Sequence, residues 1–270
     1  MTVFGVVVPT AEGIFNGQCV QRHILSRTHH QPNACIRSGC IWLTSSAAHA
    51  GSRYAVNDVS PWSSTPPTYS GGMKIVIPGG TGQVGGILRR ALAARGHEVV
   101  VLSRHAGALE PGVRHTPWDG RSLGAWASEV DGADAVINLA GRTVSCRYTE
   151  ENLRQMMDSR VESTRVVGEA IAKAAAPPRV WLQMSTATIY ADRRDAPNDE
   201  STGIIGGHEP GVPGYWEYSV RIAQTWEATQ LTADVPETRK VQLRAAMVMS
   251  PDRGGVFDVL LRMVRLGLGG

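Results

Sequence analysis

Lys74–Ile77 (Lys-Ile-Val-Ile) runs directly into Pro78-Gly79-Gly80-Thr81-Gly82-Gln83-Val84-Gly85, and this stretch decides the fold. A residue without Cβ at Gly79 permits a tight turn, and one at Gly82 lets a diphosphate approach the backbone. Gly85 lets the following helix lie close to the sheet. The N-terminus of that helix offers unpaired N–H groups and a partial positive charge to phosphates. A glycine triplet alone also fits an ordinary strand–helix turn, but its place between a strand and an amphipathic helix predicts a nucleotide site.

Strand-like and helical segments alternate outward from this turn. The predicted strands are short apolar runs at Lys74–Ile77, Glu98–Leu102, Val113–Pro117, Ala133–Leu139, Val180–Met184 and Val241–Met249. The predicted helices run from Gln83 to Arg95, from the capping residue Thr149 to the Pro177-Pro178 pair, from Tyr215 to Leu231 and from Val256 to Leu266. This alternation predicts an α/β fold, a Rossmann-like doubly wound parallel sheet with helices on both faces. Such sheets bind ligands beyond the carboxyl ends of their strands.

The composition changes near Met73. Residues 1–72 hold four of the 27 Lys and Arg residues and two of the 24 Asp and Glu residues, and they show no sustained helical or alternating period. We interpret this segment as a disordered extension, or as upstream sequence that does not belong to the native protein, with Met73 as the natural start. Residues 73–270 then form an NAD(P)-binding Rossmann domain.

An alternative for the first segment is a metal site. Its candidate ligands are Cys19, His23, His29, His30, Cys35 and Cys40. Zinc sites usually combine closely spaced ligand pairs, and only Cys35 and Cys40 approach that spacing. We therefore predict no metal.

The bulk properties exclude two classes of partner. A net charge of +3 gives little electrostatic support for nucleic-acid binding. The arginines on or beside the helix after Thr149 are interleaved with acids, which predicts a solvated face; they are Arg147, Arg154, Arg160 and Arg165. No apolar run approaches the roughly 20 residues that a membrane helix needs. We expect a cytoplasmic protein with a small-molecule substrate; its oligomeric state is not indicated.

The end of the second predicted strand indicates which cofactor is bound. Proteins that bind NAD usually place Asp or Glu there, to accept from the ribose 2′-hydroxyl. This chain has Ser103-Arg104, and its next carboxylate is Glu110. The forked cation of Arg104 suits a 2′-phosphate, with Ser103 as a second donor. NADP(H) is therefore predicted in preference to NAD(H), although a solvated arginine at a strand end is the plainer interpretation.

Two more strand ends complete the predicted nucleotide site. Trp118 and Asp119 follow the third strand, where an adenine edge would lie, and Asp119 can accept from the exocyclic amine. Leu139-Ala140-Gly141 follow the fourth strand, and their small side chains let the chain pass close to the cofactor.

Three motifs stand out: the glycine-rich turn at 79–85, Asn138-Leu139-Ala140-Gly141, and Ser185-Thr186-Ala187-Thr188-Ile189-Tyr190. Together they resemble the extended short-chain dehydrogenase/reductase superfamily, and within it the NAD(P)-dependent epimerase/dehydratase family. Finer features resemble its YfcH-like branch; they are Ala135-Val136-Ile137-Asn138-Leu139-Ala140-Gly141, Asp158-Ser159-Arg160 through Thr164, Trp226-Glu227-Ala228 and the closing Gly267-Leu268-Gly269-Gly270. In that branch more sequence follows the closing glycines, so the resemblance implies a chain truncated at its C-terminus, without a C-terminal substrate-side segment.

The resemblance also implies a catalytic set. The family uses a Ser or Thr at the end of the fifth strand and a Tyr-x-x-x-Lys pair on the next helix, while nicotinamide carries the hydride. Thr186 stands at the hydroxyl position with Ser185 beside it, and Tyr218 is the candidate tyrosine. Position 222 is isoleucine rather than lysine, so Arg221 is the candidate substitute for the missing cation.

Two functions follow from this incomplete set. The first is an oxidoreductase or epimerase that acts on a small carbonyl or hydroxyl compound by hydride transfer. The second is a non-catalytic NADP(H)-binding protein that senses redox state or binds a partner. The hydroxyl cluster at Ser185 and Thr186 favours the first, and the missing lysine favours the second.

Overall fold

A computed structural model describes residues 71–105, 107, 109–250 and 252–268. It contains a six-stranded parallel sheet in the order β3-β2-β1-β4-β5-β6. The strands are β1 Lys74–Pro78, β2 Glu98–Ser103, β3 Val113–Pro117, β4 Ala135–Asn138, β5 Val180–Thr186 and β6 Arg239–Ala245. The helices are α2 Gln83–Ala93, α3 Glu150–Lys173, α4 Gly214–Leu231 and α5 Val256–Arg265, with short 3₁₀ turns η1 Ala125–Glu129 and η2 Ala187–Ile189. All six predicted strands and all four predicted helices are therefore confirmed.

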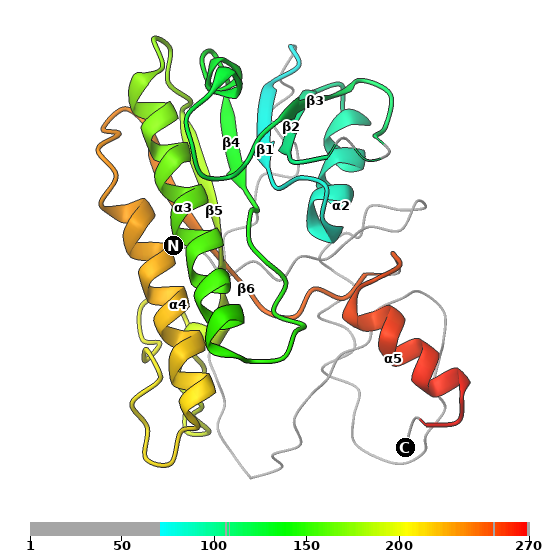
Figure 1. Ribbon diagram of the computed structural model, residues 1–270, viewed down its shortest axis with the longest axis vertical. Coiled ribbons are helices and arrows are strands. Elements are labelled where there is room, and N and C mark those ends of the chain that lie inside the picture. The colour runs from blue at the N-terminus through cyan, green and yellow to red at the C-terminus, as the bar shows by residue number, and fades with distance from the viewer. Residues whose placement is uncertain (1–70, 106, 108, 251, 269–270) are drawn as a thin grey trace, which may run out of the picture. The chain divides into compact units, whose positions relative to one another are not determined.

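Helices cover both faces of the sheet, as Figure 1 shows, with α3 and α4 side by side on one face and α2 on the other. The core on the α3 face includes Val76, Val136, Val167 and Trp181, and the core on the α2 face includes Ile75, Ile77, Val99 and Val101. Neighbouring residues of β1 thus alternate between the two cores, as the period of two in a strand requires. The predicted doubly wound fold is confirmed.

The strand order reverses between β1 and β4, which are neighbours in the sheet although β2 and β3 lie between them in the chain. In open parallel sheets the crevice beyond this point is where ligands bind. The glycine-rich turn after β1 and the Leu139–Gly141 segment after β4 are the two chain segments that meet there. The backbone N–H of Leu139 donates to the carbonyl oxygen of Pro78 over 2.8 Å, which ties them together.

Local signals define the helix ends. The Asn152 N–H donates to the Thr149 side chain (3.3 Å), so Thr149 is the N-cap of α3 as predicted. Glu150 and Glu151 lie in the first turn of α3, where negative charge is favourable. After α2, Gly96 adopts a φ of 78°, the left-handed conformation that ends a helix.

Several strand boundaries differ by one to four residues from the sequence prediction, and strand pairing explains the C-terminal ends of β5 and β6. Strand β5 continues for two residues to Thr186, because its pairing with β6 runs on to Ala245 opposite Thr186. Strand β6 ends at Ala245 rather than at Met249, because β5 offers no partner beyond that pair. Met247 accordingly lies 61% exposed after the end of the strand.

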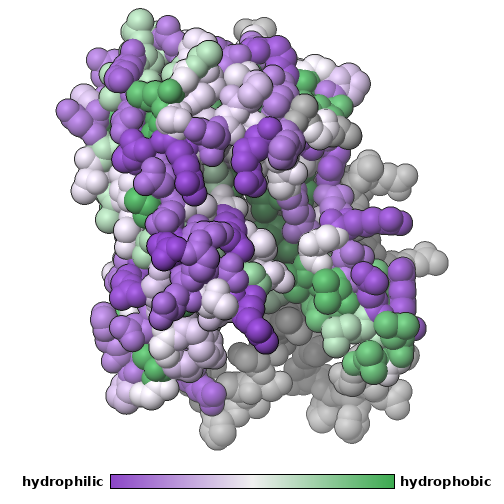
Figure 2. Space-filling model, viewed as in Figure 1, coloured by the Kyte–Doolittle hydropathy of each residue, from purple (hydrophilic) through white to green (hydrophobic). Residues whose placement is uncertain are grey.

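The last helix, α5, has no buried residue among those described. Its exposed apolar side chains include Val259, Leu260, Met263 and Val264, and Figure 2 shows this hydrophobic patch near the lower right of the molecule. No described helix is both long and apolar enough to span a bilayer. The first segment at 1–70, with its candidate metal ligands, and the closing Gly269-Gly270 lie outside the described residues.

Candidate functional site

The turn after β1 is shaped by glycines where side chains would not fit. Gly79 has a φ of 73°, and a Cβ there would lie 2.7 Å from the Ala140 backbone. A Cβ on Gly85 would lie 2.3 Å from the carbonyl oxygen of Gly80, so the first turn of α2 lies directly against the loop. Gly82 is different, because it is exposed and its nearest neighbour would be 3.8 Å away. The space above Gly82 is therefore open.

The N-terminus of α2 fits an anionic ligand. Its N-cap Gly82 has no side chain to accept a hydrogen bond, and its first turn has no acidic residue. The first helical hydrogen bond runs from the Gly86 N–H to the Gly82 carbonyl (2.8 Å), so the N–H groups at 83–85 have no helical partner. Helix α3, by contrast, has both a capping threonine and two glutamates. Helix α2 thus has free N–H groups and no negative charge at its N-terminus, which are the properties that a phosphate-binding helix needs.

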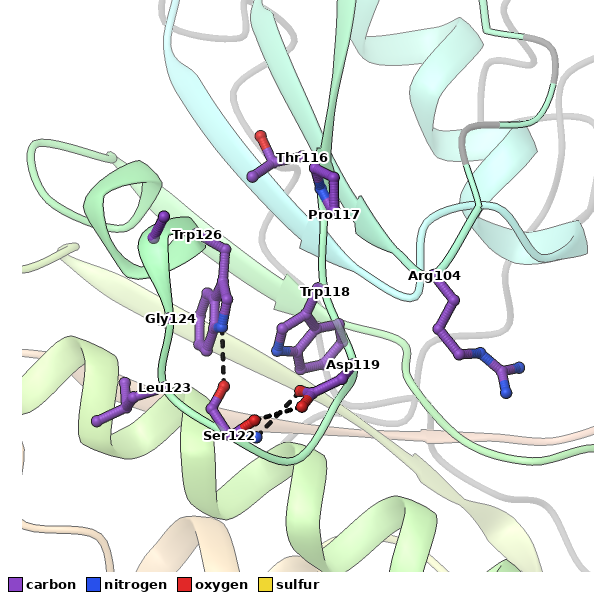
Figure 3. Close-up of a pocket in the computed structure, with 10 residues that line it drawn as sticks. Arg104, Thr116, Pro117, Trp118, Asp119, Ser122, Leu123, Gly124 and Trp126 are labelled. Carbon is purple, nitrogen blue, oxygen red and sulfur yellow. Dashed lines mark hydrogen bonds between the residues drawn. The ribbon is translucent and has the colours of Figure 1, made fainter.

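An open hollow of about 520 Å³ lies at the ends of β2 and β3. Arg104, Trp118, Asp119 and Ser122 are among its lining residues, and Figure 3 shows Arg104 extending from the end of β2 across from Trp118. Arg104 is exposed, and no carboxylate of the described residues pairs with it. The structure thus brings together the predicted 2′-phosphate and adenine residues.

Two residues of that prediction already have hydrogen-bond partners within the chain. Ser103 is 8% exposed, and its hydroxyl donates to the carbonyl oxygen of His105 (2.7 Å), so the exposed Arg104 is the more accessible donor for a 2′-phosphate. The Asp119 carboxylate accepts from the Ser122 hydroxyl and from the N–H groups of Ser122 and Arg121. These bonds hold the pKa of Asp119 below its usual range and tie its carboxylate to the loop, and its contact with an adenine stays a prediction.

Trp118 has a structural role as well as a place in the hollow. It is 6% exposed, and its ring meets that of Trp126 edge-on with centroids 5.5 Å apart. The Trp126 Nε1–H donates to the Ser122 carbonyl oxygen (2.9 Å), which fixes the loop that carries Asp119. Sequence reasoning gave Trp118 only a ligand role, whereas the structure also makes it part of the core.

The side chain of Asn138, the last residue of β4, holds the segment that follows this strand. This residue is fully buried; its amide nitrogen donates to the Gln183 side chain (2.9 Å), and its oxygen accepts from the Ala140 N–H (3.1 Å). Leu139, Ala140 and Gly141 are thereby positioned at the carboxyl end of the sheet opposite Gly79. Asn138 itself is structural.

A buried network of charged and polar side chains joins the end of β5 to α4 and β6. The Ser185 hydroxyl donates to Glu227 (2.5 Å), and Arg244 donates to both oxygens of Glu227 (2.8 and 2.7 Å). Arg244 also donates to the Tyr190 hydroxyl (2.8 Å). Ser185 is only 3% exposed and is a structural member of this network, and its catalytic role stays a prediction. Only Thr186, one residue further and half-buried, remains as the hydroxyl at the strand end.

The model of the NAD dependent epimerase/dehydratase family matches residues 75–264. The chain belongs to this family. The resemblance seen in the sequence motifs is thereby confirmed, and the family match begins at β1 and ends within α5.

Relatives within the epimerase family are similar over most of the described residues. The epimerase family protein SDR39U1 of Homo sapiens is 33% identical over 202 residues, which are 73% of this chain and 62% of that protein. The epimerase family protein YfhF of Bacillus subtilis is 34% identical over 119 residues, 44% of this chain and 39% of that protein. The chain therefore spans less than two thirds of the length of these relatives.

Solved structures support the same fold. A crystal structure of human SDR39U1 (isoform 2) with NADPH has a TM-score of 0.60 and 31% identity, and covers 73% of this chain and 61% of that chain. A nucleoside-diphosphate sugar epimerase from Corynebacterium glutamicum has a TM-score of 0.54 and 26% identity, over 72% of this chain and 38% of that one.

The candidate tyrosine of this epimerase-family chain is paired as the sequence suggested, but with a different geometry. The guanidinium carbon of Arg221 lies 4.5 Å from the centre of the Tyr218 ring, so the cation stacks on the ring face. Ile222, where the family pattern has lysine, is 6% exposed in the core. The Thr186 hydroxyl donates to Thr188 (3.0 Å) and accepts from its N–H, which caps η2. No described hydrogen bond joins Thr186 to Tyr218.

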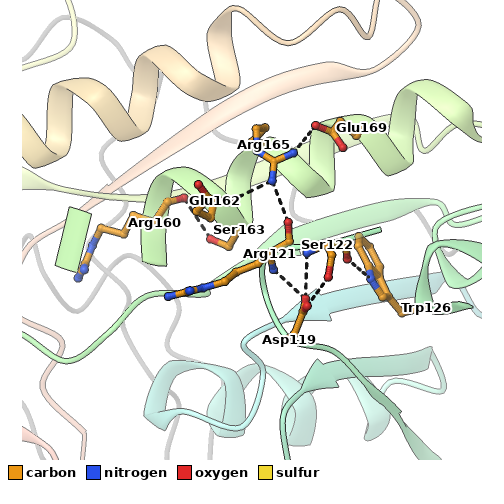
Figure 4. A network of polar contacts seen from close by, with 9 residues as sticks. All are labelled: Asp119, Arg121, Ser122, Trp126, Arg160, Glu162, Ser163, Arg165 and Glu169. Carbon is orange, nitrogen blue, oxygen red and sulfur yellow. Dashed lines mark hydrogen bonds and ion pairs between the residues drawn. The ribbon is translucent and has the colours of Figure 1, made fainter. Parts of the chain in front are cut away.

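The predicted solvated arginine face on α3 is confirmed in part. Arg165 pairs with Glu162 (3.1 Å) and Glu169 on the surface, and Arg154 pairs with Glu151. Arg160 does not fit that prediction, because it is half-buried and stacks on the Trp226 ring, 5.0 Å from its centre. Figure 4 shows the guanidinium of Arg160 apart from the carboxylates drawn around Arg165. The alternation of acids and arginines along α3 gives no sign that Arg160 packs against α4, because that contact depends on the direction in which its side chain leaves the helix.

Proposed function

We propose that this epimerase-family chain binds NADP(H) and is an oxidoreductase or epimerase acting on a small carbonyl or hydroxyl compound. The observation that carries the cofactor choice is Arg104, an exposed guanidinium at the end of β2, where proteins that bind NAD place a carboxylate. The uncapped N-terminus of α2 adds a site for the diphosphate. The solved structure of human SDR39U1 contains NADPH, which supports the same choice.

In this proposal each part of the site has one task. The N–H groups at 83–85 bind the diphosphate, and Arg104 donates to the 2′-phosphate. The bound nicotinamide supplies or accepts a hydride. Thr186 would hold the substrate oxygen and Tyr218 would move its proton, with the stacked Arg221 as the nearby cation.

Replacement of Arg104 by alanine should weaken NADPH binding by about tenfold while leaving NADH binding nearly unchanged. One charge-assisted contact at an exposed position is worth roughly that factor. Fluorescence titration of the full chain with each nucleotide measures both affinities. Arg95→Ala is the matched control, because Arg95 is also exposed but lies at the C-terminal end of α2 and bonds the Ala91 carbonyl. Equal, weak binding of both nucleotides by the unmodified chain would refute the cofactor choice.

A non-catalytic NADP(H)-binding function is the second candidate. It is favoured by the buried Ile222 at the lysine position and by the lack of a described contact between Thr186 and Tyr218. Tyr218→Phe separates the two candidates. An enzyme should lose turnover of NADPH with a panel of small aldehydes and ketones by about 100-fold or more, because its general acid is gone, and should keep its NADPH affinity. Unchanged turnover in the variant would argue against Tyr218, and no turnover in the unmodified chain would favour the binding function.

A further inference from the structure

Arg160 is a cation at the carboxyl end of the sheet that no described carboxylate balances. Its guanidinium carbon lies 5.0 Å from the centre of the Trp226 ring, and a Cβ on Gly141 would lie 3.3 Å from the same carbon. One of its N–H groups donates to the Met156 carbonyl oxygen (2.9 Å) of its own helix. The guanidinium is thus wedged between the segment after β4 and helix α4. Gly141 is exposed, so this contact opens to solvent.

The energetics of this position favour an anionic ligand. Burial lowers the pKa of Arg160 to about 10, and the nearby Tyr148 opposes that change, so the side chain remains a cation at neutral pH. A guanidinium has five N–H donors, and among the described residues only one hydrogen bond uses them. Removing a cation partly from water without a counter-charge is unfavourable. An oxyanion that accepts two hydrogen bonds from the guanidinium would offset this cost. Arg165 on the same helix shows the contrast, because two glutamates pair with it.

The position of Arg160 indicates where such an anion belongs. The glycine-rich turn after β1 and Arg104 after β2 account for the diphosphate and the 2′-phosphate of the proposed cofactor. Gly141 follows β4, on the other side of the reversal in strand order, and the adjacent strand β5 ends at Thr186. This is the half of the crevice where nicotinamide and substrate meet in a dinucleotide fold.

We propose that Arg160 binds an oxyanion of the substrate, so that the substrate is a carbonyl or hydroxyl compound that also carries a carboxylate or phosphate group. This inference rests on the proposed function. One exposed tyrosine can add a hydroxyl donor: Tyr148 acts electrostatically on Arg160, and its ring meets that of Tyr215 edge-on at 6.4 Å. The cofactor's own diphosphate is the other source of an oxyanion.

The test is an anion titration of the full chain at constant ionic strength, with inorganic phosphate and with acetate, in the presence and absence of saturating NADPH. Calorimetry and NADPH fluorescence measure binding. Arg160→Met should weaken the binding of the preferred anion by about tenfold or more, and Arg160→Lys, which keeps the charge but not the fork, should weaken it less. Arg154→Met is the matched control, because Arg154 lies on the same helix but is exposed and paired with Glu151.

The outcomes separate the two sources of the anion. Arg160-dependent anion binding with unchanged NADPH affinity supports the proposal. A loss of NADPH affinity in a folded Arg160→Met variant assigns the residue to the cofactor and overturns it, as does anion binding that is absent or insensitive to position 160. If the methionine variant does not fold, as judged by circular dichroism, the lysine variant decides in its place. Failure of the unmodified chain to bind NADPH overturns the proposed function instead, and the titration without nucleotide still tests the anion site.

Discussion

Replacing Glu227 by glutamine is expected to lower the free energy of unfolding by about 3–5 kcal/mol, the usual cost of leaving one member of a buried ion pair without its partner. Glu227 and Arg244 are 5% and 7% exposed, and each carboxylate oxygen accepts from a different nitrogen of the guanidinium. A glutamine has a similar shape but presents one acceptor and an amide donor facing the cation. The Ser185 hydroxyl loses its charged acceptor in the same change.

Urea unfolding, followed by tryptophan fluorescence, measures the effect. The double variant Glu227→Leu, Arg244→Met should be more stable than Glu227→Gln alone, because it removes both charges rather than one. Arg165→Ala, which breaks exposed pairs with Glu162 and Glu169, is the surface control and should cost about 1 kcal/mol or less. A Glu227→Gln variant no less stable than this control would contradict the importance of the buried network.

The fold was predictable because its signals are local. Strand β2 is a run of apolar residues buried on both faces, and Thr149 and Gly96 mark helix ends through their own side-chain or backbone properties. The glycine-rich turn could be recognised because each steric requirement falls on a residue a few positions from the strand that precedes it. The exact ends of β5 and β6 could not, because they depend on how far the two strands pair, which is a contact between segments more than fifty residues apart.

The site was less predictable for the same physical reason. In the sequence Ser185 and Thr186 are two adjacent hydroxyls, and the fold shows that one donates to Glu227 and the other to Thr188. The role of Arg160 likewise depends on Trp226 and Gly141, which come from α4 and from the segment after β4. Alternation along a strand predicts that neighbouring side chains face opposite ways, so the burial of Ser185 could have been suspected.

Replacing Gly79 by alanine should lower the free energy of unfolding by about 2–5 kcal/mol, from two effects that add. A side chain at a φ of 73° costs about 1–2 kcal/mol, and a methyl group 2.7 Å from the Ala140 backbone forces the segments after β1 and β4 apart. The backbone atoms cannot turn away as a flexible side chain would. Gly112→Ala is the matched control, because Gly112 has a φ of 84° with nothing within 4 Å of its Cβ position, and it should lose only the first part.

Gly82→Ala completes the comparison, because its effect should appear in binding rather than in folding. Gly82 has a φ of −72°, which any residue adopts, and open space at its Cβ position, so its stability should change by less than about 1 kcal/mol. The added methyl group would stand where a diphosphate must approach the N–H groups of α2, so NADPH affinity should fall by about tenfold or more. Chemical denaturation and NADPH titration of the three variants should therefore show that Gly79 is required for stability and Gly82 for cofactor binding. A Gly82→Ala variant that binds NADPH normally would mean that the diphosphate does not lie against this turn.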